Sequence, residues 1–213
     1  MSSPINWHIE FARIINCAGC SVTIDHNLLR DSDENIPQPG YIGTNYDTTR
    51  VLLVGQNPGT PKSLAEKDRP YTAALRALRD EPTPTRYLRL TEVLDKFIPE
   101  WPVHGKYFPL SECGLSLQDI AYCNIVRCRT RGDKAPNIKM TEKCANNHFS
   151  RWLRILSPRV VVFIGKWASA RGASTISATN IPHTFINRQR SLSTAERVAN
   201  RAAVVSLVRQ YCG

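Results

Sequence analysis

Two unlike pairs of cysteines constrain the fold of this chain more than any other feature. Cys17 and Cys20 form CAGC near the N-terminus, whereas fifteen residues separate Cys128 from Cys144. A C-x-x-C pair can chelate one metal centre, and the distant pair completes a four-thiolate shell only where the fold brings the chain back to its beginning. The pattern therefore favours a metal site that joins two distant parts of the sequence.

The same cysteines have a second interpretation. The CAGC pair could be a surface dithiol, and the other two could be small buried hydrophobes, because free cysteine is among the most buried residue types. A disulfide framework is not expected, since the chain has seven cysteines, an odd number, and MSSPINWHIEFARI does not look like a secretory leader. No apolar stretch approaches the roughly 18 residues that span a bilayer. We expect a cytoplasmic protein without a membrane partner.

The charge of the chain indicates a phosphate-bearing partner. Lysine and arginine number 28 against 18 acidic residues, which gives a net charge of +10. Six of the cations surround the second cysteine pair: Arg127, Arg129, Arg131, Lys134, Lys139 and Lys143. A basic surface binds nucleic acid by releasing counterions. The alternative is a basic protein whose charge serves solubility alone.

Strand and helix patterns alternate along the chain. Apolar runs at 50–57, 119–126 and 159–165 predict buried parallel strands. Helical patterns cover Tyr71–Arg79, Tyr87–Phe97 and Thr141–Leu156, and a last one runs from the Ser193-x-x-Glu196 capping box to about Tyr211. The predicted fold class is α/β, a three-layer α/β/α sandwich around a mostly parallel central sheet. We expect a single domain over residues 1–213, with an irregular, proline-rich insertion at about 80–117.

Polar residues follow two of these strands directly. The first strand runs into Gly55-Gln56-Asn57-Pro58-Gly59, and Asn124 falls near the end of the second. Ligands of open α/β sheets collect beyond the carboxyl ends of the strands. The GQNPG turn could also be an ordinary strand-to-helix connection, but its combination with Asn124 and the cysteines makes this edge the candidate site.

In order and spacing, these elements resemble the uracil-DNA glycosylase superfamily, and most closely its iron-sulfur branch, family 4. The matching segments are CAGC, LLVGQNPG, KDRPYTAAL, YCNIVRCRT, Cys144 and RVVVFIGKWA. The resemblance implies a uracil-DNA glycosylase-like fold. It also implies that Cys17, Cys20, Cys128 and Cys144 bind a four-iron four-sulfur (4Fe-4S) cluster.

The resemblance also implies a base pocket. A glycosylase extrudes the target base from the stack and reads its Watson-Crick edge. Tyr71 stands where the family stacks an aromatic ring on the base, and Asn124 corresponds to the asparagine that reads uracil. Gly55 would let the base approach the backbone. The alternative for Tyr71 is a packed core aromatic.

Three residues are implied in the chemistry. Asn57 would orient water, Gln56 would contribute mainly backbone contacts, and His183 would donate to the base O2 as negative charge develops there. The chain departs from the family here: Gln56 and Asn57 replace carboxylates, and Ile181-Pro182-His183-Thr184 is an altered version of the family's histidine motif. We therefore expect slow turnover, or a substrate other than uracil.

Basic and aromatic residues are expected to contact DNA. Arg129 and Arg131 would face phosphate, and Phe185, Arg188 and Arg190 would belong to a loop that enters the duplex. The sequence then predicts a monomeric, monofunctional DNA repair glycosylase that excises uracil or a related deaminated base and associates with the nucleoid. Two other interpretations stay open: a catalytically weak or inactive lesion-binding protein of the same fold, and a zinc-stapled nucleic-acid-binding domain.

Overall fold

The computed structural model describes residues 5–21, 23–29, 36–59, 69–100, 108–177, 179–189 and 191–212. These residues form two compact units, each built from three chain segments. The cysteine-bearing unit comprises Met1–Pro39, Asn57–Ile98 and Val126–His148, and the sheet unit comprises Gly40–Gln56, Pro99–Ile125 and Phe149–Gly213. Each unit is described by itself.

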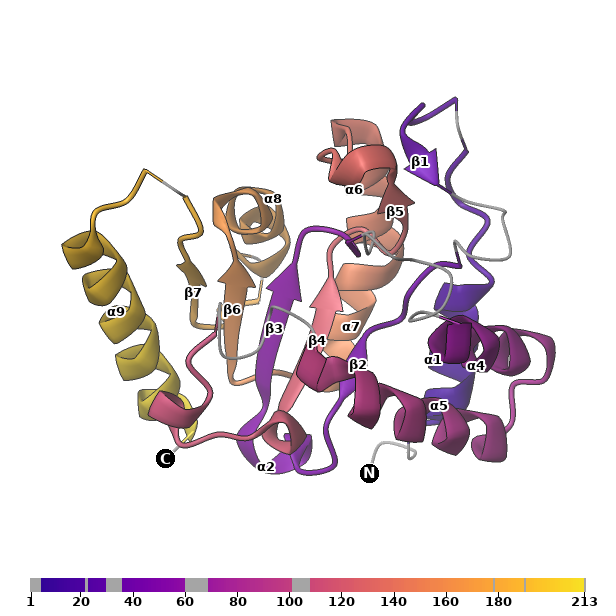
Figure 1. The fold of residues 1–213 in the computed structure, drawn as a ribbon, viewed down its shortest axis with the longest axis horizontal. Helices are drawn as coiled ribbons and strands as arrows, with labels where there is room; N and C mark the ends of the chain where they lie inside the picture. The colour runs from indigo at the N-terminus through magenta and orange to yellow at the C-terminus, as the bar shows by residue number, and fades with distance from the viewer. Residues whose placement is uncertain are drawn as a thin grey trace. The chain divides into compact units, whose positions relative to one another are not determined.

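The sheet unit contains a five-stranded sheet of order β2-β4-β3-β6-β7 (Figure 1). Its strands are β2 (Tyr41–Ile42), β3 (Val51–Gly55), β4 (Ile120–Asn124), β6 (Val160–Ile164) and β7 (His183–Ile186). Strands β4, β3, β6 and β7 run parallel, and only the short edge strand β2 is antiparallel within this sheet. Every residue of β3, β4 and β6 is buried, as in a sheet covered on both faces.

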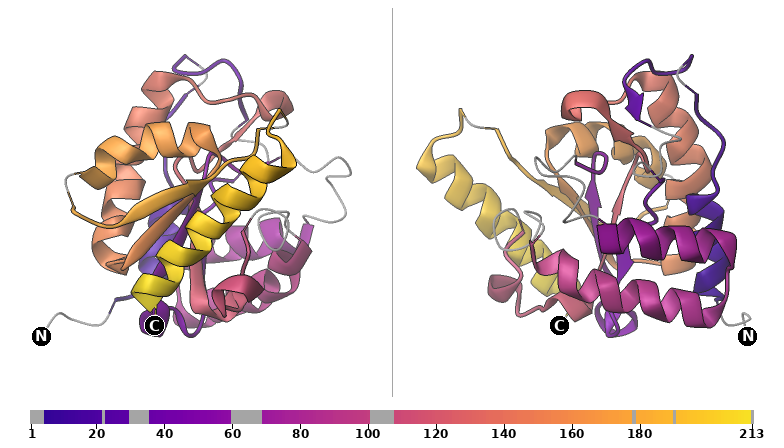
Figure 2. Two further views of the ribbon diagram at one scale, coloured as in Figure 1. Left: turned by 90° about the vertical axis from the view of Figure 1, so that its left-hand side faces the viewer. Right: turned by 45° about the vertical axis from the view of Figure 1, so that its right-hand side comes forward.

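Helices cover both faces of this sheet. Helix α8 (Lys166–Ser177) and helix α9 (Thr194–Cys212) each contact β6 and β7. The left panel of Figure 2 shows the two helices on opposite sides of these strands. Gly172 lets α8 approach closely, because a Cβ there would lie 2.2 Å from the Phe163 ring. The predicted three-layer α/β/α class, with a mostly parallel sheet, is confirmed. The short helix α2 (Tyr46–Thr49) and helix α7 (Ser150–Leu156) complete the α-helices described in this unit.

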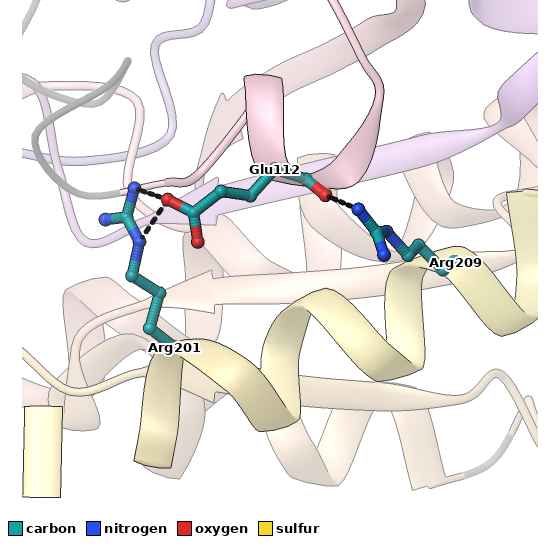
Figure 3. A network of polar contacts seen from close by, with 3 residues as sticks. All are labelled: Glu112, Arg201 and Arg209. Carbon is teal, nitrogen blue, oxygen red and sulfur yellow. Dashed lines mark hydrogen bonds and ion pairs between the residues drawn. The ribbon is translucent and has the colours of Figure 1, made fainter. Parts of the chain in front are cut away.

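A polar network joins the C-terminal helix to the short 3₁₀ helix η2 (Ser111–Cys113). The Arg201 guanidinium pairs with the Glu112 carboxylate, and Arg209 donates to the Glu112 main-chain carbonyl at 2.6 Å (Figure 3). The pKa of Glu112 is lowered, chiefly by the hydrogen bond from Arg201. Since Arg201 and Arg209 lie two turns apart on α9, one residue of η2 contacts a long stretch of the helix.

The cysteine-bearing unit is mostly helical. It contains α1 (Trp7–Ile15), α4 (Arg69–Asp80), α5 (Pro84–Phe97), α6 (Ile138–Cys144), and a two-stranded antiparallel ribbon of β1 (Leu28–Leu29) and β5 (Arg129–Thr130). Helices α1, α4 and α5 pack on one another, and Phe11 meets Tyr87 edge to face at 5.0 Å. The Asn137 side chain caps α6 by accepting from the Met140 N–H at 2.8 Å.

The predicted helices are observed with some changes of boundary. The segment Thr141–Leu156 is split by a π-turn, Ala145–Phe149, between α6 and α7. The insertion at 80–117 contains α5, the 3₁₀ turn η1 (Ile98–Glu100) and η2, while 101–107 lie outside the described residues. That residues 1–213 form a single domain stays a prediction.

Candidate base-reading edge and cysteine cavity

The carboxyl ends of β3 and β4 bring Gly55 and Asn124 side by side. The two residues are register partners in the parallel pair of β3 and β4. Asn124 is 6% exposed, and its Oδ1 accepts a hydrogen bond from the Tyr122 hydroxyl at 2.8 Å. A Cβ on Gly55 would lie 2.3 Å from this Oδ1 and 2.7 Å from the hydroxyl oxygen. Glycine is therefore required for the amide to reach its position at this edge.

Gln56, the next residue of the turn, belongs to the same unit and is half-buried. Asn57 belongs to the cysteine-bearing unit, where its Nδ2 donates to Thr130 Oγ1 at 3.1 Å. Thr130 in turn donates to the Lys134 carbonyl at 2.5 Å. This chain of hydrogen bonds fixes which end of the Asn57 amide is the carbonyl. A fixed carbonyl oxygen can orient a water molecule, but it cannot take a proton as a carboxylate can.

Tyr71 lies in the first turn of α4 and is 1% exposed. It belongs to the cysteine-bearing unit with Asn57, whereas Asn124 belongs to the sheet unit. The burial of Tyr71 is what a packed core aromatic requires. The stacking role that the resemblance implies stays a prediction.

His183 does not reach the edge formed by Gly55 and Asn124. It is the first residue of β7 and pairs with Val161, so it lies toward the amino end of the parallel strands. Its ring packs edge to face against Phe163 at 6.1 Å, and its Nδ1 lies 3.1 Å from the Ile181 carbonyl. The predicted contact between His183 and the base O2 is not supported by this position.

Asn187 is the residue that follows β7 at the carboxyl edge. Ile186, just before it, pairs with Ile164 at the end of β6. The Asn187 main-chain N–H donates to Asn200 Oδ1 of α9 at 2.8 Å, and its own Oδ1 accepts from the Gln189 N–H at 3.1 Å. The sequence does not predict this placement, because its pattern favours a loop that includes Phe185. The signal is weak: HTFI is a short run with two polar residues.

The residues that the sequence predicts to contact DNA divide into exposed and covered side chains. Phe185 lies within β7, paired with Phe163, so it is not in a loop as predicted, and Arg190 lies outside the described residues. Arg188 is exposed beyond β7, and Arg131 is exposed beyond β5. Arg129 is 5% exposed, so the structure does not place this cation at the surface as predicted.

The four paired cysteines converge on one cavity of the cysteine-bearing unit. Its lining includes all four together with Arg127 and residues of α6 and the π-turn: Cys17, Cys20, Pro37, Arg127, Cys128, Met140, Cys144, Asn147 and His148. Cys20, Cys128 and Cys144 are buried, and Cys17 is half-buried. The long-range convergence that the cysteine spacing predicts is thus observed.

Backbone donors and a cation surround these sulfurs. The Arg127 N–H donates to Cys144 Sγ at 3.3 Å, and the Gly19 N–H donates to Cys17 Sγ at 3.4 Å. The Arg127 side chain is 1% exposed and donates to the Pro39 carbonyl at 2.5 Å. Burial raises the pKa of the Cys144 thiol to about 12, and the neighbouring Arg127 acts in the opposite direction. Such N–H···S contacts and a buried positive charge stabilise thiolates that bind metal.

His148 has an unusual position on the wall of this cavity. It is 5% exposed, and neither ring nitrogen has a hydrogen-bond partner among the described residues. Burial, followed by the charges of Arg127 and Arg13, lowers its pKa to about 4, so the imidazole is neutral at pH 7. A neutral imidazole carries one N–H donor. The π-turn is what carries His148 to the cavity.

Four cysteine thiolates are the ligand set of a structural zinc ion or of an iron-sulfur cluster. In the described part of the chain, no three Cys, His, Asp or Glu side chains are grouped closely enough to hold one ion. A tetrahedral zinc site would need sulfurs about 3.8 Å apart, given Zn–S bonds of about 2.3 Å. In a four-iron four-sulfur cluster each thiolate binds a different iron, so the sulfurs stand farther apart. The four thiols that line one cavity provide the donor set of either kind of centre.

Comparisons with known proteins identify the class. The family model for the Uracil DNA glycosylase superfamily matches residues 43–205, and this chain belongs to that superfamily. The match includes β3, β4, β6 and β7 with the edge residues described above.

A curated relative gives a more particular likeness. The chain is 24% identical over 141 residues to a protein named type-4 uracil-DNA glycosylase from Archaeoglobus fulgidus. The alignment covers 66% of this chain and 56% of that relative's length. The resemblance stated from the motifs is confirmed at the level of the superfamily and of this type-4 relative.

In the described residues no helix is long and apolar enough to cross a membrane.

Proposed function

We propose that this protein is a DNA glycosylase that hydrolyses the N-glycosidic bond of uracil or a related deaminated base. The observation that carries the proposal is the Asn124 amide, held beside Gly55 at the carboxyl edge of the sheet. An amide there can donate to the O4 of uracil and accept from its N3–H, whereas cytosine presents the opposite groups. Membership in the superfamily supports the same reaction.

Asn57 supplies the second part of the proposed mechanism. Bond cleavage builds positive charge on the sugar and negative charge on the departing base, and both need electrostatic stabilisation. The Asn57 carbonyl orients the attacking water and presents a partial negative charge to the sugar. Gln56 contributes mainly through its backbone. Water is the nucleophile, so the enzyme is monofunctional, and one protomer carries the whole set of residues.

A four-iron four-sulfur cluster is part of the proposal. Cys17, Cys20, Cys128 and Cys144 would hold it, and their convergence on one cavity supports this assignment. The cluster supplies no electrons to a hydrolysis, so its contribution is structural. Held by these cysteines, a cluster would tie the segment after Cys128 to the segment after α1, and would thereby order the exposed cations Arg131, Lys134, Lys139 and Lys143 for phosphate.

A base-excision screen tests the enzyme. Single-turnover assays would use DNA that carries uracil, hypoxanthine, xanthine or thymine opposite each normal base, with wild type, Asn124→Ala and His183→Ala. We expect release of at least one of these bases by wild type, a large loss in Asn124→Ala, and little change in His183→Ala. No release of any base by folded wild type contradicts the proposal.

The second candidate is a lesion-binding protein of the same fold. The observation that favours it is the pair of amides, Gln56 and Asn57, in place of carboxylates, together with the position of His183 away from the edge. Gel-shift measurements on uracil-containing single and double strands separate the two. Selective binding without base release identifies a binding protein, and release identifies an enzyme. We also propose that the protein associates with the nucleoid, and fluorescence microscopy of a labelled copy of the protein tests this localisation.

A further inference from the structure

The His148 side chain is a buried polar group on the wall of the cysteine cavity. It is 5% exposed, and both ring nitrogens are buried without a hydrogen-bond partner among the described residues. An imidazole carries at least one N–H donor, and a buried donor that stays unpaired destabilises the fold. Buried polar groups in folded proteins are nearly always paired. An acceptor within the cavity that the ring lines would satisfy this donor.

Sulfur atoms are the main acceptors that this cavity offers. Apart from the exposed Asn147 amide, the side-chain acceptors that line it are the four cysteine sulfurs and the Met140 thioether, which accepts only weakly. The charged neighbours of the ring, Arg127 and Arg13, carry donors and no acceptor. A metal-bound thiolate is negatively charged, and hydrogen bonds to charged acceptors are stronger than those between neutral groups.

Two other N–H groups contact sulfur in the same cavity. The Gly19 N–H donates to Cys17 Sγ at 3.4 Å, and the Arg127 N–H donates to Cys144 Sγ at 3.3 Å. Partners of this kind around a metal site stabilise the ligand charge and fix the ligands in place. His148 comes four positions after Cys144, about one helical turn, so the two side chains lie on the same side of the chain.

We propose that His148 donates a hydrogen bond to a sulfur of the cysteine-bound centre and thereby retains the metal in this cavity. The four thiolates complete the ligand set, so His148 supports the ligands and does not bind metal itself. The acceptor is a sulfur whether the centre is a zinc ion or an iron-sulfur cluster. The inference therefore rests on the proposed function only for the presence of a metal centre, and not on base excision.

The test measures how fast the metal-loaded protein loses its metal. Protein would be purified without oxygen, its iron and zinc measured, and release followed with bathophenanthroline disulfonate for iron or 4-(2-pyridylazo)resorcinol for zinc. His148→Phe keeps a ring but has no donor, and we expect release about 10-fold faster than from wild type. His148→Leu is a second variant without a donor, in case His148→Phe does not fold.

Two variants that keep a donor separate hydrogen bonding from packing. His148→Asn places an amide N–H near the position of Nδ1, and His148→Gln places one near Nε2. We expect at least one of them to restore slow release. His148→Leu has the same shape as His148→Asn, so a difference between these two variants reports the donor and not the volume of the side chain.

Asn147→Leu is the matched control. Asn147 lines the same cavity but is exposed, so water can satisfy its amide, and its loss should leave the release rate nearly unchanged. Release at the wild-type rate from both variants without a donor overturns the inference, and so does equally fast release from all four His148 variants. Zinc in place of iron contradicts the proposed cluster alone if the variants without a donor still release faster. Wild type that binds neither metal overturns both, and His148-dependent retention in a protein that excises no base overturns the proposed activity alone.

Discussion

At the scale of single residues, the edge of the sheet has no space beside Gly55. The Asn124 amide and the Tyr122 hydroxyl occupy the volume that a side chain would take, with contacts that would fall to 2.3 and 2.7 Å. Both groups lie on a buried strand and are joined to each other, so neither can move without breaking a buried hydrogen bond. The edge is therefore sensitive to the addition of a single methyl group.

Gly55→Ala should destabilise the protein by about 1 to 3 kcal/mol, the usual cost of overpacking a well-packed core. It should also abolish the preference among bases, because Asn124 is displaced. Chemical denaturation measures the first effect. The ratio of the dissociation constants for DNA that carries uracil and DNA that carries cytosine measures the second. Gly59→Ala is the matched control, since a Cβ there meets nothing within 4 Å. Equal stability of the two variants would contradict the close packing at Gly55.

Asn57→Ala should lower the single-turnover excision rate about 10-fold to 1000-fold, the range for loss of one preorganised polar group. Asn57→Asp should raise the rate, because a carboxylate adds a full charge and a possible base. Both are measured with DNA saturated by enzyme, so that weaker binding does not enter. Undiminished activity in Asn57→Ala would move the catalytic centre elsewhere. Activity found in the Asp variant alone would favour a lesion-binding protein.

The positions of Gly55 and Asn124 could be predicted from the sequence, because each ends a buried apolar run. The hydrogen bond between Tyr122 and Asn124 could not, since a tyrosine in such a run is also a normal core residue. His183 was misplaced for a related reason: a four-residue strand shifts the edge from residue 183 to residue 187.

At the scale of elements, the π-turn Ala145–Phe149 directly follows the last cysteine of the cavity. π-Turns are rare and often occur at functional sites, because they rotate the following side chains relative to an α-helix. Here the turn brings Asn147 and His148 to the cavity wall. The buried imidazole thus lines a site that also contains four cysteines, and neither of its ring nitrogens has a hydrogen-bond partner among the described residues.

His148→Phe should weaken retention of the cysteine-bound centre about 10-fold, as loss of a supporting hydrogen bond around a metal site commonly does. The ring is kept, so the packing of the turn changes little. The rate at which visible absorption bleaches under an iron chelator, without oxygen, is the measurement. His26→Phe, at an exposed position of the same unit, is the control. Equal bleaching rates in the two variants would show that His148 does not support the centre.

The pair formed by Glu112 with Arg201 should make stability depend on pH. The folded-state pKa of Glu112 is lowered, so its contribution is present above the ordinary carboxyl pKa of 4.5 and is lost as pH falls through the lowered value. Glu112→Gln should therefore be less stable than wild type at pH 7, and the difference should vanish in acid. Denaturant midpoints at several pH values check this. Glu142→Gln, at an exposed carboxylate of α6, is the control, and the same pH trend there would contradict the assignment.

The three central strands were predictable because β3, β4 and β6 are continuous apolar runs. Strand β7 was not, since an edge strand is covered less and keeps polar residues. Helix α8 was not predicted either, because KWASARGASTIS is rich in small residues and has little amphipathic contrast. The π-turn was not predicted from helical periodicity, because each flanking helix keeps its own 3.6-residue pattern and the turn shows only as a one-residue shift between the two patterns.

At the scale of the whole molecule, the cysteine cavity joins segments that lie more than a hundred positions apart in the sequence. Cys17 and Cys20 follow α1, whereas Cys128 and Cys144 flank the ribbon strand β5 and helix α6. A bound centre closes a long loop, and its binding energy adds to the stability of the folded chain. The sequence predicted this convergence from cysteine spacing, but the burial of Arg127 and Arg129 could not be foreseen from charge alone.

Cys128→Ala should abolish iron binding and lower both the stability and the affinity for DNA. Iron content, denaturant midpoint and gel-shift titration measure the three effects. Cys113→Ala is a matched control, because Cys113 and Cys128 are each 7% exposed and Cys113 does not line the cavity. The control should keep its iron and its DNA affinity. A Cys128→Ala protein that stays as stable as wild type and binds DNA normally would contradict a structural role for the centre.

The segments of the two units alternate along the sequence, and this alternation affects the order in which the units can fold during synthesis. Residues emerge from the ribosome starting at the N-terminus, and domains fold as units as their residues become available. The last segment of the cysteine-bearing unit ends at His148, before any residue of β6 or β7 has been synthesised. At that moment the sheet has β2, β3 and β4 but lacks two of its five strands. The nascent chain can thus bring its four paired cysteines together first, with the parallel sheet completed afterwards.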